Sequence, residues 1–205
     1  IMHSNNETGI IQPLKKIRQI IEGKNIYIFS DATQSVGKVD LDDVFESVDF
    51  ACFSAHKFYG PKGIGLVYAK DRSKNNILRS LIQGGGQQKM MRGGTINTSA
   101  IAGFAKALKL CYTLGKKEQH RLMNLRNKLE SGLLKIEGAF SNSIAADRLP
   151  NTLNISFSYV DGFKLLSALS KYMAVSNGSA CNSANEKPSH VLIAMGVEPN
   201  LAFSS

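Results

Sequence analysis

The sequence predicts an α/β protein, because short buried strands alternate with amphipathic helices and polar side chains follow directly after the strands. This alternation favours a sheet with crossover connections. We expect a large α/β domain part at residues 1–98, with a mixed sheet and flanking helices. A connecting helix and a smaller, incomplete α+β domain are expected at residues 99–205.

The elements of the first part are predicted from apolar patterns and from the residues that bound them. A helix at 13–22 begins with Pro13 and is followed by Gly23, residue types that favour helix starts and helix ends. Short apolar segments predict strands at residues 26–30, 50–54 and 64–69.

In the second part, apolar residues at helical spacing predict a helix from Ser99 to about Ile136. We expect Gly115 to kink or split this helix, because glycine weakens a helix interior. A loop, a strand, a helix, a short strand and a helix are predicted next, at residues 140–151, 153–157, 162–172, 174–176 and after Pro188.

The composition is ordinary for a globular chain, with 205 residues, 43% hydrophobic and 20% charged. No apolar run approaches the roughly 18 residues of a membrane-spanning helix, and we expect no membrane partner. The net charge is +9. The densest basic group has helical spacing without aromatic residues, so we interpret it as a solvated helix face and expect no nucleic acid partner. Its members are Lys116, Lys117, Arg121, Arg126 and Lys128.

The three cysteines have no C-x-x-C spacing, so neither a disulfide framework nor a zinc site is indicated. Cys52, in a strand pattern, and Cys111, at helical spacing, are interpreted as core residues. Cys181 differs, because small and polar residues surround it. A thiol in such a loop is a candidate nucleophile.

Polar side chains follow two of the predicted strands. Asp31 comes after the first, and it is either a cap for the next turn or a functional acid. Ser54 ends the second and His56 follows it at an alternate position, so both can lie on one face and bind one phosphate. Taken alone, Lys57 fits a surface lysine and His56 a structural histidine.

A pyridoxal 5'-phosphate (PLP) enzyme requires an amine, an acid and several groups that donate hydrogen bonds to the cofactor phosphate. The sequence offers groups of all three kinds. Gln34 lies three residues after Asp31 and reaches the same side if the segment turns helically. The glycine-rich segments 84–87 and 92–95 indicate close backbone approach without matching a phosphate-binding glycine pattern.

Taken together, these features resemble the NifS/IscS-type cysteine desulfurases, within the class V aminotransferase-like PLP enzymes. The matching segments run in family order across nearly the whole chain, at residues 3–9, 31–37, 54–65, 84–87, 92–95, 149–154 and 179–184. The series is specific, although each segment alone is not. The resemblance implies PLP-dependent transferase fold type I.

The resemblance also implies which residues bind the cofactor, namely Asn6, Asp31, Gln34, Ser54, His56, Lys57 and Thr95. Lys57 would form the Schiff base with PLP, and Asp31 would face the pyridine nitrogen. The amides of Asn6 and Gln34 would bind the ring oxygen. Ser54 and His56 would bind the phosphate, whereas Thr95 would reach the phosphate of the partner subunit's cofactor in a homodimer.

The implied catalytic residues are Lys57, His56 and Cys181. Cys181 would attack the sulfur of L-cysteine, giving L-alanine and an enzyme persulfide. The persulfide would pass to an acceptor such as an iron–sulfur scaffold protein or a tRNA-modifying enzyme. No resident metal is implied, and Cys181 would at most ligate a scaffold-held iron–sulfur cluster transiently.

The match departs from the family pattern at both ends. Family members have an upstream region with a phosphate-binding turn and a ring-stacking histidine, and a downstream arginine for the substrate carboxylate. The sequence begins at Ile1 and ends at Ser205 without them, so we expect an internal fragment with weak or no activity by itself. We expect a cytoplasmic protein, or a mitochondrial or organellar one if the source is eukaryotic.

Two alternatives remain open. A selenocysteine lyase shares most of the matching segments, although the loop around Cys181 favours a desulfurase. A non-catalytic basic binding module would take up no cofactor and would bind its partner in a salt-dependent way.

Overall fold

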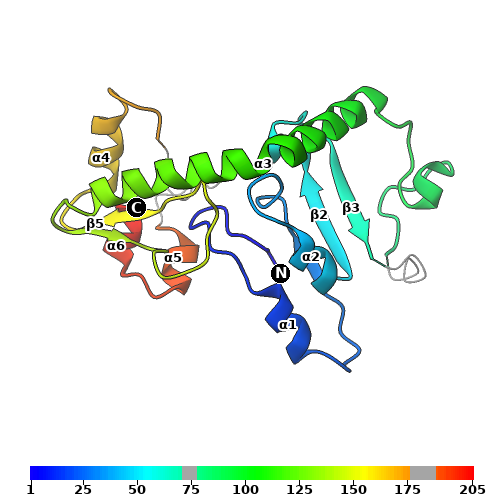
Figure 1. Ribbon diagram of the computed structural model, residues 1–205, viewed down its shortest axis with the longest axis horizontal. Coiled ribbons are helices and arrows are strands. Elements are labelled where there is room, and N and C mark those ends of the chain that lie inside the picture. The colour runs from blue at the N-terminus through cyan, green and yellow to red at the C-terminus, as the bar shows by residue number, and fades with distance from the viewer. Residues whose placement is uncertain (71–77, 176–187) are drawn as a thin grey trace. The chain divides into compact units, whose positions relative to one another are not determined.

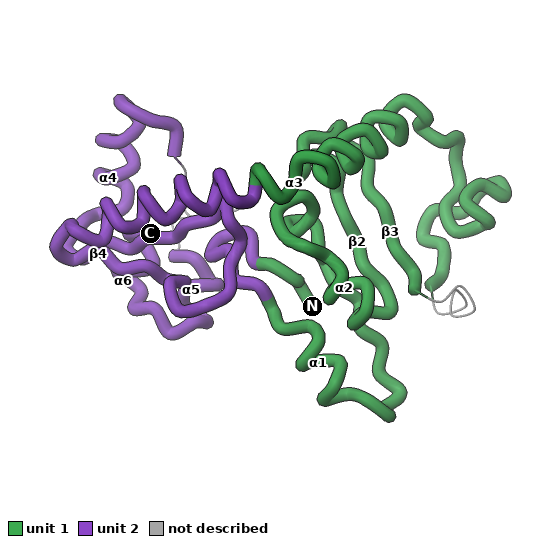
Figure 2. Tube along the Cα trace, in the orientation of Figure 1, with its two compact units in different colours: residues 1–4, 12–118 green, residues 5–11, 119–205 purple. Residues whose placement is uncertain are grey.

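The computed structural model describes residues 1–70, 78–175 and 188–205. These residues form two compact units, which are coloured separately in Figure 2. Unit 1 comprises residues 1–4 and 12–118, and unit 2 comprises residues 5–11 and 119–205. The domain boundary expected after residue 98 stays a prediction.

Unit 1 contains a mixed sheet in the order β1-β2-β3. Strand β1 (Phe29–Asp31) pairs in parallel with β2 (Phe50–Ser54), and β2 pairs antiparallel with β3 (Gly65–Ala69). A parallel pair needs a crossover connection, which here includes helix α2 (Asp42–Ser47), as Figure 1 shows. The predicted α/β class with a mixed sheet is therefore confirmed.

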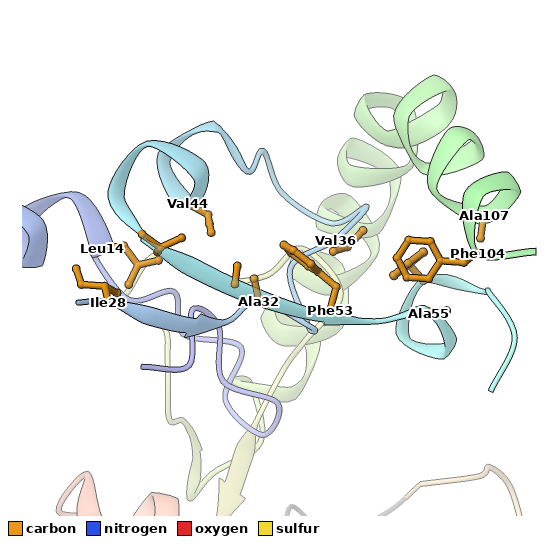
Figure 3. Close-up of a cluster of buried hydrophobic side chains, with 12 residues drawn as sticks. Leu14, Ile28, Ala32, Val36, Val44, Phe53, Ala55, Phe104 and Ala107 are labelled. Carbon is orange, nitrogen blue, oxygen red and sulfur yellow. The ribbon is translucent and has the colours of Figure 1, made fainter. Parts of the chain in front are cut away.

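The core of unit 1 gathers side chains from the sheet and from the helices around it. Ala51 and Phe53 alternate on β2, so both contribute to the same face. Leu14 of α1 (Leu14–Ile20), Val44 of α2 and Phe104 of α3 (Thr98–Leu133) join this cluster, most of which Figure 3 shows. The apolar faces predicted for these segments are thus buried together.

Helix α3 is continuous from Thr98 to Leu133, so the break predicted near Gly115 is wrong. A single glycine costs a helix interior only about 1 kcal/mol, which a long helix absorbs. Gly115 is buried in the structure. In the part of the chain that the structure describes, no helix is both long and apolar enough to cross a membrane.

Unit 2 contains the antiparallel pair β4 (Ala139–Ser141) and β5 (Ile155–Phe157). Its other helices are α4 (Gly162–Leu169), α5 (His190–Ala194) and α6 (Pro199–Phe203). The rings of Phe163 and Phe203 meet edge to face with centroids 5.0 Å apart, which packs α4 against α6. The hydroxyl of Ser204 donates to the Phe157 carbonyl at 2.6 Å and ties the end of α6 to β5.

Three further sequence-based expectations are revised. Residues 140 and 141, assigned to a loop, belong to β4. Residues 174 and 175 are irregular and exposed, so the strand predicted there is wrong for them, and Ser176 lies outside the described residues. Four of the five basic residues on α3 are exposed as predicted, whereas Arg126 is half-buried and donates to the Leu149 carbonyl at 2.7 Å.

Candidate functional site

The candidate site lies in unit 1, where β1 and β2 end. Because the two strands are parallel, their carboxyl ends meet at one edge of the sheet, where α/β proteins commonly bind ligands. Asp31 is the last residue of β1 and pairs with Cys52 of β2. Ser54 ends β2, and the 3-10 turn η1 (Ala55–Phe58) follows with His56 and Lys57.

Asp31 uses its carboxylate to cap the turn that follows it. Its Oδ1 accepts a hydrogen bond from the Thr33 backbone N–H at 2.9 Å, so the turn-capping interpretation is confirmed. The carboxylate also raises the pKa of the thiol of Cys52, its partner on β2. A carboxylate has about four acceptor positions, so the bond to Thr33 leaves capacity for a further donor. The capping role and a functional role are therefore compatible.

Ser54 and His56 form a hydrogen-bonded pair. The Ser54 Oγ lies 2.9 Å from His56 Nδ1, so the expectation that both side chains share a face is confirmed. Both residues are at least partly exposed to solvent. A hydroxyl next to an imidazole provides the donors that a phosphate needs.

Lys57 is exposed and lies between a histidine and the buried ring of Phe58. The turn that holds it closes through a 2.9 Å hydrogen bond from the Gly60 N–H to the Ala55 carbonyl. A Cβ on Gly60 would lie 2.8 Å from the Ala55 Cβ, so the close approach requires glycine. The buried Phe58 and this tight turn anchor the segment while the amine remains accessible.

Gln34 lies in the turn after β1, and its side-chain oxygen accepts a hydrogen bond from Lys38 Nζ at 3.1 Å. Burial lowers the pKa of Lys38, and the positive charge of Lys57 lowers it further. Lys38 is thus hydrogen-bonded to Gln34 and is affected by the charge of Lys57. Lys38 was not identified from the sequence, although its spacing of four residues from Gln34 is a helical contact distance.

The glycine-rich segments approach each other closely. The Gly93 N–H donates to the Ile82 carbonyl at 2.7 Å, and a Cβ on Gly93 would lie 2.7 Å from the backbone of Gln83 and Gly84. The close backbone approach predicted for these segments is therefore confirmed, and it joins one segment to the other. Thr95 follows in this loop and is exposed.

Asn6 belongs to unit 2 and is exposed there in the turn at 5–11. The Asn5 Oδ1 accepts hydrogen bonds from the N–H groups of Glu7 and Thr8, both at 2.9 Å. The Glu7 carboxylate accepts from Ser189 Oγ at 2.5 Å. The sequence predicted only a loop here, because the partners that order it come from distant segments.

Cys52 and Cys111 are half-buried free thiols. They are therefore less buried than their interpretation as core residues predicted. Burial raises the pKa of each thiol. Cys181 lies outside the described residues, and its role stays a prediction. Among residues 1–70, 78–175 and 188–205, no group of three or more His, Cys, Asp or Glu side chains is arranged to hold a metal ion.

Comparison with known proteins gives one consistent result. A family model, aminotransferase class-V, matches residues 1–200. The cysteine desulfurase IscS of Anaeromyxobacter sp. (strain Fw109-5) is 42% identical over 206 residues, which cover 100% of this chain and 50% of that protein. The chain therefore spans about half the length of this curated relative.

Solved structures agree with this similarity. A NifS-like protein superimposes with a TM-score of 0.84 at 38% identity, covering 99% of this chain and 52% of that one. A NifS-like protein from Rickettsia africae ESF-5 gives a TM-score of 0.84 at 31% identity, covering 100% of this chain and 53% of that one. The fold type expected from the sequence is therefore confirmed.

Proposed function

Because this chain belongs to the aminotransferase class-V family, we propose that it takes part in a PLP-dependent cysteine desulfurase reaction. The reaction converts L-cysteine to L-alanine and leaves a persulfide on Cys181. The observation that supports this proposal most directly is the meeting of an acid and an amine at one sheet edge. Asp31 ends β1 and Lys57 follows β2, and the two strands are parallel neighbours.

The cofactor of this family is PLP, and the described side chains fit its chemistry. When bound, PLP supplies an aldehyde that amines attack and a ring that accepts electron pairs. Lys57 offers an exposed amine, and Asp31 offers a carboxylate with acceptor capacity for a protonated ring nitrogen. The pair Ser54 and His56 offers donors for the phosphate. These side chains thus offer partners for the aldehyde, the ring nitrogen and the phosphate of the cofactor.

We assign the remaining site residues on the family resemblance. The Gln34 amide is proposed to donate to the ring oxygen, and Asn6 is given the same role. Thr95 is proposed to contact the phosphate of a second subunit's cofactor, which requires a homodimer. His56 is proposed to act at the reacting centre as well as at the phosphate.

The sulfur transfer step assigns Cys181 as the nucleophile. Its thiolate attacks the sulfur of the substrate cysteine, so that an S–S bond forms and the C–S bond breaks. The electron pair of the broken bond stays with carbon, which takes up a proton and becomes the methyl group of alanine. The terminal sulfur then leaves with an acceptor, proposed to be an iron–sulfur scaffold or a tRNA-modifying enzyme.

Cofactor capture tests the first half of this proposal. The purified chain is mixed with PLP, reduced with borohydride and mapped by mass spectrometry. We expect a pyridoxyl group on Lys57 and not on Lys62, a nearby exposed lysine that serves as an internal control. A Lys57→Arg variant should lose this label. Labelling spread evenly over exposed lysines would contradict a built PLP site.

Product release tests the second half. Alanine is measured after adding cysteine or selenocysteine to the wild type and to Cys181→Ala, with Cys111→Ala as the matched control. Alanine from cysteine that requires Cys181 but not Cys111 supports the desulfurase. Activity restricted to selenocysteine would indicate a lyase instead. Repeating both assays on the chain extended to the length of its relatives shows whether the additional length changes activity.

A further inference from the structure

Lys38 is a partly buried lysine in unit 1. It lies in the turn after β1, is half-buried, and donates to Gln34 Oε1 at 3.1 Å. Lysine side chains usually extend so that the charged end stays in water. The burial of Lys38 therefore indicates that its position is fixed by the groups around it.

Helix α3 contacts both the turn that contains Lys38 and the turn η1. A Cβ on Gly37 would lie 2.6 Å from the Cys111 Sγ, so α3 packs directly on the turn that contains Lys38. Cys111 also approaches the Phe58 carbonyl of η1, with its Sγ at 3.9 Å. The titratable groups that act on Lys38 are Lys57, which lowers its pKa, and Cys111, which raises it. Burial is the largest cause of the lowered pKa.

We propose that Lys38 is a positioning residue for the Lys57 site, where it orients the Gln34 amide. The proposal rests on the proposed function, because that function gives Gln34 its role. It adds a residue that acts through Gln34 and does not itself react.

The orientation of the Gln34 amide follows from hydrogen-bond chemistry. An ammonium group has three donors and no acceptor, so only the oxygen of the Gln34 amide can face it. The amide nitrogen must then face away from Lys38, with both of its hydrogens available. Gln34 is thereby fixed as a donor, which suits a partner oxygen that bears negative charge.

PLP capture by variants of Lys38 tests the orienting role. Lys38→Glu places an acceptor beside Gln34, so the amide should turn its nitrogen toward residue 38 and lose its donor role. We expect roughly tenfold less borohydride-fixed PLP on Lys57 in Lys38→Glu, with recovery in Lys38→Arg. Equal capture in all variants would contradict the orienting role.

The same assay separates this inference from the proposed function. If the wild type captures no PLP on Lys57, the proposed function fails, and the inference that rests on it fails too. If the wild type captures PLP on Lys57 but capture does not change in Lys38→Glu, the proposed function stands and this inference fails.

Discussion

Glu130 of α3 and Arg148 form a buried two-point ion pair in unit 2. Arg148 Nη1 lies 2.7 Å from Glu130 Oε1, and Nη2 bonds to Oε2. Ser141 of β4 adds a third hydrogen bond to Oε1 at 2.6 Å. The side chains of Arg148 and Glu130 are only 8% and 7% exposed. The pair therefore joins α3, β4 and the segment before β5 through one carboxylate.

Glu130→Gln should destabilise unit 2 strongly. The substitution leaves the buried Arg148 charge without its anion, and breaking a buried ion pair in this way costs about 3 kcal/mol or more. We expect a clear fall in the urea midpoint, followed by circular dichroism. Glu137→Gln is the matched control, because Glu137 is exposed and should change the midpoint little. Equal midpoints for the two variants would show that the buried pair contributes nothing.

The same ion pair should make the free energy of unfolding depend on pH in the acid range. The hydrogen bond from Arg148 is the main cause that lowers the pKa of Glu130, while burial opposes it. The pKa of Glu130 is therefore lower in the folded state than in the unfolded state, where a glutamate has a pKa of about 4.3. The ion pair stabilises the folded state fully above this unfolded value, and the stabilisation is lost as the pH falls through the lowered pKa. The difference in unfolding free energy between wild type and Glu130→Gln should therefore shrink from pH 6 to pH 3. A constant difference over this range would contradict the assigned sign.

The strand β2 shows what the sequence predicts well. Its bounds, Phe50 to Ser54, match the prediction, because the apolar run ends at a polar residue and a glycine-proline turn follows. Strand β1 is shorter than the predicted 26–30 segment, because residues 26–28 are irregular. The Ile28 N–H bonds instead to the Asp49 carboxylate at 2.9 Å, so a distant side chain replaces a ladder contact.

The candidate site shows the same limit. Asp31, Ser54, His56 and Lys57 were found because strand ends are visible in the sequence. Lys38 was missed, because its significance depends on its partial burial and on its hydrogen bond to Gln34. Helix α2 was also missed, since its six residues are too few for a clear helical pattern.

Gly93→Ala should weaken the loop that contains Thr95. The new Cβ would lie 2.7 Å from the backbone of Gln83 and Gly84, which must shift, at a typical cost of about 1–3 kcal/mol. Gly86→Ala is the matched control, because nothing lies within 4 Å of its Cβ position. We expect faster proteolysis between residues 80 and 97 in Gly93→Ala only. Identical cleavage of both variants would show that the close approach does not order the loop.

The pairing of Asp31 with Cys52 predicts the reactivity of a thiol. Burial is the largest cause that raises the pKa of Cys52, and the negative charge of Asp31 and its hydrogen bond raise it further. Since the thiolate is the reactive form, Asp31→Asn should speed the labelling of Cys52 by iodoacetamide at pH 8 by roughly three- to tenfold. Site-specific mass spectrometry measures the rate.

Cys111 is the internal control in the same protein. Burial also raises the pKa of its thiol, but the charge that acts on it is that of Lys38 and not that of Asp31. Its labelling rate should therefore be the same in wild type and Asp31→Asn. A general loosening of the fold would speed both thiols, whereas the specific contact predicts a change at Cys52 alone. An unchanged Cys52 rate would show that the Asp31 carboxylate does not act on this thiol.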